Sequence, residues 1–558
     1  MQQSVPSPSV LQATFAATLF DEWCRSGLTD VVLCPGSRST PLALAAAGRP
    51  ELVVHVRIDE RSAGFFALGR AMRTRRPVAI VVTSGTAAAE LHAVVAEADL
   101  ANVALLVLTA DRPPELHHVG APQTMDQRAL FAGMVRRFEE PGVARLASAE
   151  SWRPLASRLW SSAAGVSAWA GPVHLNAAFV EPLVGEPIAT PSGRAANRPW
   201  RTYHRPPEVD GAFAVNAQRV LAVVGHGVGR ETIEECTALG WAVLGDATAE
   251  GSVAYFDALL RDEGFADAAR PDLVVRLGGL PASKVLQNQL RRWGRPTVAF
   301  AGAGPVADPD GAVSEVVAGL PRGDASALRA DPRYDAWWRA ASASVEEWFS
   351  ISEQEESGLS EPYVARSVVA ASSLHQVPLV IGSSMPVRDV EWWTPPRTCA
   401  TFSNRGVSGI DGVVSTALGT AVSGRSLALM GDLTFLHDVS GLVDGLGEAG
   451  GCCVLVVVNN HGGGIFSFLD QASTMTKDSF DRLLATPRSA DLVALARAFG
   501  HRGVRVATRG ELRSALDDGL EESGLTVIEA PVPDGAQNVR RHDALNRAVR
   551  DCWSRNDS

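Results

Sequence analysis

The sequence predicts an α/β protein with three doubly wound domains, each built on a parallel sheet. Short apolar segments alternate with helix-compatible segments in three separate parts of the chain, which is the pattern of parallel sheets flanked by helices. Several apolar segments end abruptly in glycines and polar residues, as strands do at the edge where such sheets bind ligands. At 558 residues, the chain is too long for one hydrophobic core.

Two segments without hydrophobic periodicity divide the chain. Residues 190–206 are dense in Pro, Gly and Arg, and residues 320–357 are polar, so both are expected to contain linkers. We therefore expect a first domain over residues 1–190, a central domain over 191–350 and a third domain over 351–558.

The composition excludes several classes of protein. The net charge of −11 argues against a general nucleic-acid surface. The seven cysteines are scattered without a CxxC pair, so neither a zinc site nor a disulfide framework is indicated. The N-terminus lacks a signal pattern, and no apolar run approaches the roughly 18 residues that span a bilayer. We expect a soluble cytoplasmic protein with no membrane insertion.

The first domain is expected to begin with an amphipathic helix over residues 11–28, which places Phe15, Leu19 and Trp23 on one face. Strands are expected over residues 31–33, 52–58, 78–82 and 103–108, with helices between them. Polar loop residues follow these strands and are candidates for ligand binding: Ser37, Arg38, Glu60 and Arg112.

The central domain carries a glycine-rich loop, VVGHGVGRE, between an expected strand and an expected helix. The loop resembles part of a dinucleotide fingerprint, although glycine loops follow strands in many α/β units. It leaves open an NAD-dependent dehydrogenase, or a binding domain with a regulatory ligand such as a downstream metabolite. Further strands are expected over residues 272–277 and 296–302, with Lys284 in the segment between them.

The third domain is expected to contain strands over residues 378–381, 399–402, 426–430, 452–458 and 526–529, and a C-terminal helix rich in Arg. Asp432 and Asn460 follow two of these strands and lie 28 positions apart. Because a βαβ crossover takes about 30 residues, the two side chains can converge at one edge. A carboxylate, an amide oxygen and a freed carbonyl suit Mg²⁺.

This stretch, Gly431-Asp432 followed by Asn459-Asn460 and a glycine cluster, resembles the signature of thiamine diphosphate enzymes. The resemblance implies that Asp432, Asn460 and the Gly462 carbonyl hold Mg²⁺ (or Mn²⁺), which holds the cofactor diphosphate beside Gly431. It also implies pyrimidine-binding, central and diphosphate-binding domains.

The same resemblance implies two further cofactor contacts. Glu60, at the end of an early strand, matches the glutamate that hydrogen-bonds the aminopyrimidine ring and so activates the cofactor. Ile410, in GVSGIDG, matches the bulky apolar residue that bends the cofactor. The superfamily places its sites between subunits, so a homodimer or homotetramer is implied.

Four arginines lie just after expected strands: Arg38, Arg112, Arg388 and Arg405. Arginine binds carboxylates through two parallel hydrogen bonds. On an acidic protein, four such cations at ligand-binding edges indicate substrates with several carboxylates.

The loop sequences CPGSRSTPL, DERSAGFFALG, SNRGVSGIDG, GDLTFLHD and NNHGGGIF are similar to those of one family of thiamine enzymes, the synthases of the menaquinone pathway. Leu433 replaces a glycine found in many thiamine enzymes, and this replacement is typical of that family. The resemblance implies decarboxylation of 2-oxoglutarate and 1,4-addition of the resulting four-carbon unit to isochorismate, with release of CO₂.

The resemblance also implies residue roles. Ser384 and Arg388 would hold the distal carboxylate of the succinyl group. The residues facing isochorismate would be Ser37, Arg38, Arg112 and Lys284. Gln123 would lie near the covalent intermediate, and Asn404 and Arg405 would frame the site. An apolar wall of Ile465, Phe466 and Leu469 would exclude water from the reacting centre.

Other thiamine enzymes remain as alternatives, namely an acetolactate synthase-like enzyme or a 2-oxoacid decarboxylase. Both handle smaller and less anionic substrates, so the number of loop arginines distinguishes them from a dicarboxylate enzyme. The acetolactate synthases also often carry an FAD-binding segment, and we find no such segment in the sequence.

Overall fold

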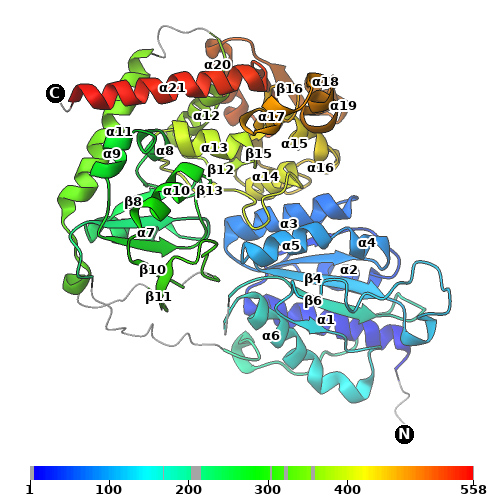
Figure 1. Cartoon of the computed structure of the whole chain (residues 1–558). Helices are drawn as coiled ribbons and strands as arrows, with labels where there is room; N and C mark the ends of the chain where they lie inside the picture. Colours follow the sequence, from blue (N-terminus) through cyan, green and yellow to red (C-terminus); the bar gives the residue numbers. More distant parts are fainter. Residues whose placement is uncertain are drawn as a thin grey trace. The chain divides into compact units, whose positions relative to one another are not determined.

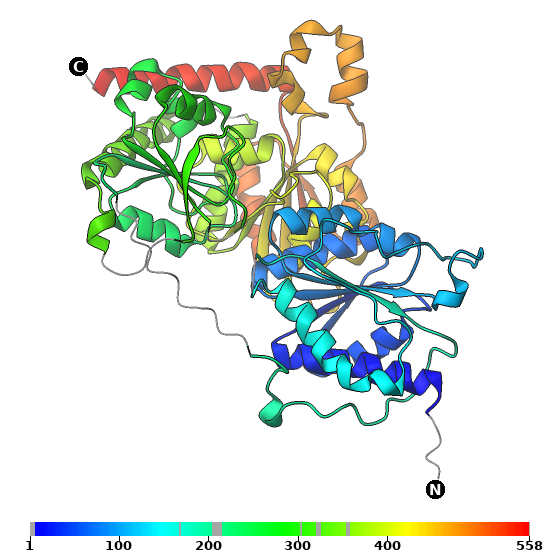
Figure 2. The ribbon, with the colours of Figure 1, turned by 60° about the horizontal axis from the view of Figure 1, so that its bottom comes forward.

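The computed structural model describes residues 6–166, 169–202, 215–301, 304–319, 325–352 and 358–556. Within these ranges the strands form three sheets, of six, five and six strands, in which all neighbouring strands are parallel. Helices flank each sheet (Figures 1 and 2). The prediction of three doubly wound parallel-sheet domains is confirmed.

The first sheet has the strand order β2-β1-β3-β4-β6-β5. Helices α3 and α5 cover one face, and α1 and α6 cover the other (Figure 1). The strands are β1 (Asp30–Leu33), β2 (Val53–Val56), β3 (Val78–Val82), β4 (Leu105–Asp111), β5 (Phe138–Glu139) and β6 (Val173–Ala178). The helices are α1 (Pro8–Ser26), α2 (Thr40–Ala47), α3 (Glu60–Thr74), α4 (Thr86–Ala89), α5 (His92–Leu100) and α6 (Trp152–Ala163), with 3₁₀ turns η1 (Pro114–Leu116), η2 (Leu146–Ser151) and η3 (Ala195–Asn197).

Helix α1 was predicted from its apolar face, and its three apolar residues Phe15, Leu19 and Trp23 are buried in the core of this domain. Its predicted end at residue 28 is wrong by two residues. Gly27 adopts φ 108°, and its N–H bonds back to the carbonyl of Cys24, so the helix closes in a left-handed glycine cap.

The central sheet has the order β11-β10-β9-β7-β8. Its strands are β7 (Val220–Val224), β8 (Ala242–Gly245), β9 (Leu273–Leu277), β10 (Thr297–Phe300) and β11 (Val313–Val317). Its helices are α7 (Arg230–Ala238), α8 (Phe256–Leu259), α9 (Glu263–Ala268) and α10 (Lys284–Trp293), and η4 (Ala325–Leu328) and α11 (Pro332–Ser352) follow.

The third sheet has the order β13-β12-β14-β15-β17-β16. Its strands are β12 (Leu379–Ile381), β13 (Thr401–Phe402), β14 (Arg425–Gly431), β15 (Cys452–Asn459), β16 (Arg502–Arg505) and β17 (Gly524–Pro531). The helices and turns are α12 (Glu361–His375), α13 (Met385–Trp393), α14 (Val413–Ala421), α15 (Asp432–His437), α16 (Gly441–Asp444), η5 (Gly464–Phe468), α17 (Gln471–Thr474), α18 (Lys477–Phe480), η6 (Asp481–Ala485), α19 (Leu492–Ala498), α20 (Arg509–Glu521) and α21 (Gly535–Asn556).

Sequence periodicity did not predict the strands β5, β6, β8, β11 and β16. Strand β6 contains His174 and Asn176, both buried and both bonded to the Thr109 hydroxyl of β4. Strand β16, RGVR, is short and polar and pairs only with β17 at the sheet edge. Strand β16 has no local apolar pattern, so its tertiary partner makes the strand. In β6, apolar residues alternate with the two buried polar ones, a strand pattern that the prediction missed.

The chain forms two compact units. Unit 1 comprises Met1–Arg205, Arg405–Gly424 and Asp438–Gly451, and unit 2 comprises the remainder. Unit 1 therefore contains α14 and α16 as well as the first sheet. Within it, α3 and α14 approach so closely that a Cβ on Gly69 would lie 2.1 Å from the Thr416 carbonyl oxygen, and one on Gly419 would lie 2.1 Å from that of Phe66.

None of the described helices has both the length and the apolar character that a crossing of the bilayer would need.

Candidate active site

The carboxyl edge of the third sheet brings Asp432 and Asn460 to neighbouring strand ends. Strands β14 and β15 pair in parallel, with Gly431 opposite Val458. Asp432 follows β14 directly, and Asn460 follows β15. The backbone N–H groups of Leu433 and Gly462 both donate to the Asp432 carboxylate, the first at 2.9 Å. The prediction that the two strand ends converge is therefore confirmed.

Asp432 is an almost fully buried carboxyl, and the hydrogen bonds that it accepts from the described residues come from backbone N–H groups. It is 3% exposed, and burial raises its pKa to about 6, although these N–H groups and the charge of His461 oppose that effect. A cation bound to this carboxylate would offset the cost of burying its charge.

Asn460 and Gly462 supply further oxygen atoms at the same edge. The Asn460 side chain donates its Nδ2 to the Glu361 carboxyl at 2.8 Å, while its buried Oδ1 has no hydrogen-bond partner among the described residues. Gly462 has φ +134°, and a Cβ there would lie 2.1 Å from the Ala485 carbonyl oxygen, so the turn requires glycine. A carboxylate, an orphaned amide oxygen and a backbone carbonyl fit a hard divalent cation such as Mg²⁺ or Mn²⁺.

An apolar turn continues from this loop. Ile465, Phe466 and Leu469 lie in or just after η5 and are half-buried. The turn is fixed at its start, because the Gly463 N–H donates to the Ala485 carbonyl at 2.7 Å. At its end, the Phe468 ring packs edge-on against His542 of α21, with centroids 5.0 Å apart.

Ser384 and Arg388 lie at the start of α13 in the same unit. Arg388 donates to the Ser384 carbonyl at 2.7 Å, and Ser384 has φ 74°, which is rare for a serine. Asn404 is buried just after β13. Lys284 is exposed at the first position of α10. The preceding loop is held to α13, because the Ala282 N–H donates to the Glu391 carboxylate at 2.8 Å.

Glu60 is the first residue of α3 in unit 1. Asp59 caps this helix by accepting the Ser62 N–H at 3.2 Å. Glu60 is half-buried, and burial raises its pKa, with the charges of Asp59 and Glu90 acting in the same direction. A carboxyl that keeps its proton more readily than usual is suited to sharing that proton with a ring nitrogen.

Two acidic residues that the sequence analysis did not single out hold the Glu60 turn. The Ile58 N–H donates to Asp444 at 3.2 Å, and the Ser62 hydroxyl donates to Asp438 at 3.3 Å. Asp438 also accepts the N–H of Ser415 on α14 at 2.7 Å. The motif GDLTFLHD ends in Asp438, so its final residue was the available signal.

Arg38 and Arg112 lie close together at the carboxyl edge of the first sheet. Burial lowers the pKa of Arg112, and the charge of Arg38 adds to that effect. Arg38 donates to the Phe179 carbonyl at 3.0 Å and to Glu181 at 3.1 Å. Ser37 is exposed in the same loop as Arg38.

Gln123 joins this arginine cluster. Its backbone carbonyl accepts a hydrogen bond from the Arg112 guanidinium at 2.9 Å, and its side-chain amide donates to the Ser84 backbone carbonyl at 3.0 Å. Arg112 also donates to the Ser84 hydroxyl. Gln123 is exposed and has φ 55°, so its backbone is held in a conformation that isolated glutamine rarely adopts.

Arg405 and Ile410, which are both half-buried, belong to unit 1. Their loop is anchored by Glu97 of α5, which the sequence analysis did not identify. The buried Glu97 carboxylate accepts the N–H groups of Gly406 at 2.6 Å and Val407 at 2.7 Å.

The candidate residues thus fall into two groups. Unit 1 holds Ser37, Arg38, Glu60, Arg112, Gln123, Arg405 and Ile410, and unit 2 holds Lys284, Ser384, Arg388, Asn404, Gly431, Asp432, Asn460, Gly462, Ile465, Phe466 and Leu469.

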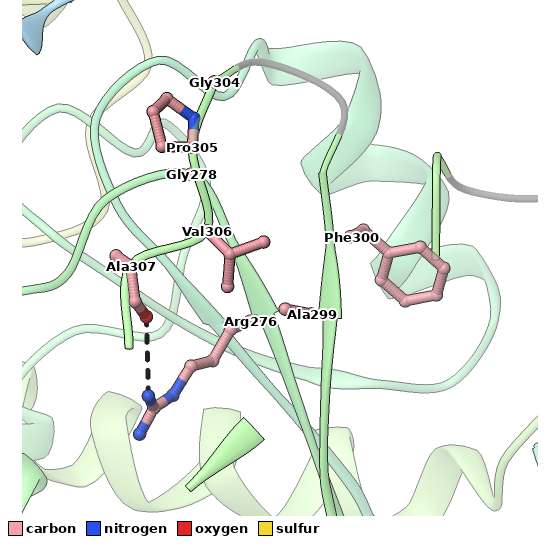
Figure 3. A pocket seen from close by; sticks show the side chains of 8 residues that line it. All are labelled: Arg276, Gly278, Ala299, Phe300, Gly304, Pro305, Val306 and Ala307. Atoms are coloured by element: carbon pink, nitrogen blue, oxygen red, sulfur yellow. Dashed lines mark hydrogen bonds between the residues drawn. The ribbon is translucent and has the colours of Figure 1, made fainter. Parts of the chain in front are cut away.

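One glycine of the central domain's loop, Gly225, is required by close packing. A Cβ on Gly225 would lie 2.0 Å from the backbone of Gly279, so glycine is needed there for two loops to touch. Nearby, a small pocket contains Arg276, whose guanidinium bonds the Ala307 carbonyl (Figure 3) and is paired with Asp308 at 2.9 Å and Asp310 at 2.8 Å.

Two family models match the chain. The thiamine pyrophosphate enzyme N-terminal TPP binding domain matches residues 13–130. The thiamine pyrophosphate enzyme C-terminal TPP binding domain matches residues 381–530. These ranges contain Glu60 and the Asp432–Gly462 edge, respectively.

Full-length relatives are also similar to this chain. A protein of Myxococcus xanthus (strain DK1622) is 39% identical over 97% of both chains. A protein of Saccharopolyspora erythraea is 40% identical over 98% of this chain and 99% of its own, and one of Thermobifida fusca (strain YX) is 39% identical over 96% and 98%. Each is named 2-succinyl-5-enolpyruvyl-6-hydroxy-3-cyclohexene-1-carboxylate synthase.

Proposed function

The chain belongs to the family of 2-succinyl-5-enolpyruvyl-6-hydroxy-3-cyclohexene-1-carboxylate synthases, the thiamine diphosphate-dependent transferases of menaquinone biosynthesis, and on this premise we propose how its residues act. The reaction joins 2-oxoglutarate, after loss of CO₂, to isochorismate. The observation that carries the assignment of the site is the buried Asn460 Oδ1, which accepts no hydrogen bond from the described part of the chain and lies at the same strand edge as Asp432.

Asp432, Asn460 and the Gly462 carbonyl hold Mg²⁺ or Mn²⁺, and Gly431 borders the diphosphate. Thiamine diphosphate, when bound, supplies a nucleophilic carbon and an electron sink for decarboxylation. The absence of a side chain on Gly431, where a Cβ would meet nothing within 4 Å, leaves room for a bound group.

Glu60 hydrogen-bonds the cofactor's pyrimidine nitrogen and holds a proton there. Its raised pKa supports this role, because the carboxyl then keeps its proton more readily than an ordinary glutamic acid does. Ile410 would supply an apolar surface for the bound cofactor.

Arginine and serine side chains bind the two substrates. Ser384 and Arg388 take the distal carboxylate of 2-oxoglutarate. Isochorismate is bound by Ser37, Arg38, Arg112 and Lys284. Gln123 lies near the reacting centre, Asn404 and Arg405 frame it, and Ile465, Phe466 and Leu469 exclude water from it. The interaction between the charges of Arg38 and Arg112 supports this division, because two cations near enough to affect each other favour a ligand with two carboxylates.

The protein acts as a cytoplasmic homodimer or homotetramer with its sites at subunit interfaces, and its domains divide near residues 190 and 350. An exposed apolar surface beside Glu60 supports the assembly. Val53 and Val56 of the edge strand β2 are 44% and 56% exposed, and Ile58 is 62% exposed. Exposed apolar residues on a sheet edge are typical of a protein contact.

A two-substrate assay tests the proposal. Purified protein with Mg²⁺, thiamine diphosphate and 2-oxoglutarate should consume isochorismate and release CO₂ in equal amounts. Release of CO₂ without loss of isochorismate would identify a plain 2-oxoacid decarboxylase instead.

A further inference from the structure

Two adjacent asparagines at the end of β15 each donate their side-chain amide nitrogen to a glutamate, but their amide oxygens differ in their partners. Asn459 donates its Nδ2 to Glu529 at 2.8 Å, and Asn460 donates its Nδ2 to Glu361 at 2.8 Å. The Asn459 oxygen accepts the His461 N–H at 3.1 Å. The Asn460 oxygen is buried and, over the part of the chain that the structure describes, no hydrogen-bond donor reaches it.

The orientation of an asparagine amide is set by its partners. Its oxygen and nitrogen differ little in size, so the group can turn over and exchange an acceptor for a donor. A carboxyl oxygen of Glu361 accepts from Nδ2, and this bond directs Oδ1 away from Glu361. An amide nitrogen cannot ligate a divalent cation, so the wrong orientation would remove one ligand from the site.

Glu361 is itself buried at the start of a capped helix. It is 3% exposed and is the first residue of α12. The preceding residue, Ser360, caps this helix by accepting the Tyr363 N–H at 3.4 Å. Glycine at 464 completes the arrangement, because a Cβ there would lie 2.3 Å from Asn460 Nδ2 and 3.5 Å from a Glu361 carboxyl oxygen.

We propose that Glu361 is a positioning residue of the divalent-cation site, which holds the Asn460 amide with its oxygen toward the cation. This inference rests on the proposed function, because it takes Asp432, Asn460 and Gly462 as the ligands. Partners of this kind orient metal ligands in many sites, and their loss weakens metal affinity about 10–100-fold.

The test measures Mn²⁺ binding to the full-length protein with thiamine diphosphate present, by electron paramagnetic resonance of free Mn²⁺. Glu361→Met removes the acceptor at similar side-chain length and should weaken Mn²⁺ binding about 10–100-fold. Glu361→Gln keeps an oxygen in the same place and should bind Mn²⁺ within about threefold of the unmodified protein.

Glu529→Met is the matched control, since it removes the equivalent acceptor from Asn459. It should lower the melting temperature but leave Mn²⁺ affinity within about threefold. If Glu361→Met bound Mn²⁺ normally, or if Glu529→Met lost as much affinity, the proposal would be overturned.

Two further variants keep the result interpretable. Asn460→Ala should lose Mn²⁺ binding. If it does so while Glu361→Met does not, only the positioning role fails, whereas normal binding by Asn460→Ala contradicts the proposed ligand set itself. Should Glu361→Met not fold, Gly464→Ala tests the same point, because its methyl group would displace Nδ2 and should also weaken binding.

Discussion

The first and third sheets share one strand order but present different chemistry at the edge where their strands end. Their orders, β2-β1-β3-β4-β6-β5 and β13-β12-β14-β15-β17-β16, are the same when the strands of each are numbered from its own start. The first edge carries Glu60, Arg38 and Arg112, and the third carries the oxygen donors Asp432 and Asn460. The two sheets therefore share one topology, and the loop residues give each edge its own chemistry.

The two regions also differ in how they treat buried charge. Asp432 is 3% exposed, and the neighbouring Asn460 amide oxygen accepts no hydrogen bond from the described residues, which suits the proposed cation site. Glu60 is only half-buried, and its surroundings push it toward the protonated form. These surroundings agree with the proposed roles, in which the third edge holds a charged group and the first edge moves a proton.

The largest expected effect is a loss of turnover that leaves cofactor binding intact. Glu60→Gln should lower kcat by about 10³-fold, because a positioned proton-transfer group contributes roughly 10²–10⁴-fold. Thiamine diphosphate binding, measured by calorimetry with Mg²⁺, should remain largely intact. A variant with a near-normal rate would show that the first edge does not activate the cofactor.

The next effect divides the two substrates between the two edges. Arg388→Ala should raise KM for 2-oxoglutarate about 10²-fold, because losing a partner of a carboxylate costs roughly 2–5 kcal/mol. Arg112→Ala should instead raise KM for isochorismate. Steady-state kinetics with each substrate varied in turn would measure which KM each variant raises. An equal effect of both variants on both KM values would contradict this division of the substrates.

The contact between α3 and α14 should be intolerant of a methyl group. Gly69→Ala would place a Cβ 2.1 Å from the Thr416 carbonyl oxygen, and overpacking of this kind costs about 1–3 kcal/mol. The melting temperature should fall. Gly510→Ala is the control, because a Cβ there meets nothing within 4 Å. Equal melting temperatures for the two variants would contradict the close approach.

The last effect concerns a buried histidine of the first sheet and is seen only at acidic pH. Burial lowers the pKa of His174 to about 3, whereas in an unfolded chain it is about 6.5. Below about pH 6.5 the unfolded state binds a proton that the folded state excludes, so stability falls as pH falls, by about 2 kcal/mol at pH 5.

Urea unfolding at pH 7 and pH 5 measures this loss of stability. His174→Gln should show a smaller difference between the two pH values, since it lacks the titrating ring. An identical difference in variant and unmodified protein would show that His174 does not contribute.

Much of the frame could be predicted from local pattern. Strand β3 was predicted with its observed bounds, Val78–Val82, because a run of five apolar residues is sufficient for a buried parallel strand. The convergence of Asp432 and Asn460 was predictable too, since one crossover connects neighbouring parallel strands.

What fixes the site residues could not be predicted, because their partners lie far away in the sequence. Ser62 and Asp438 are 376 positions apart, and Glu361 and Asn460 are 99 apart. No periodicity or spacing marks such pairs. In the sequence, Glu361 and Glu97 are indistinguishable from other polar helix residues. Only the structure shows that both are buried and hydrogen-bonded to loop residues of the site.

The sequence by itself therefore determined most of the strands, the family and the residue types at each edge, since these depend on short-range pattern and on motifs. Tertiary structure alone decided which way the Asn460 amide faces, how the Glu60 turn is held, and that β16 is a strand at all. The physical reason is that buried polar groups must find partners, and those partners are set by packing between segments that are distant along the chain.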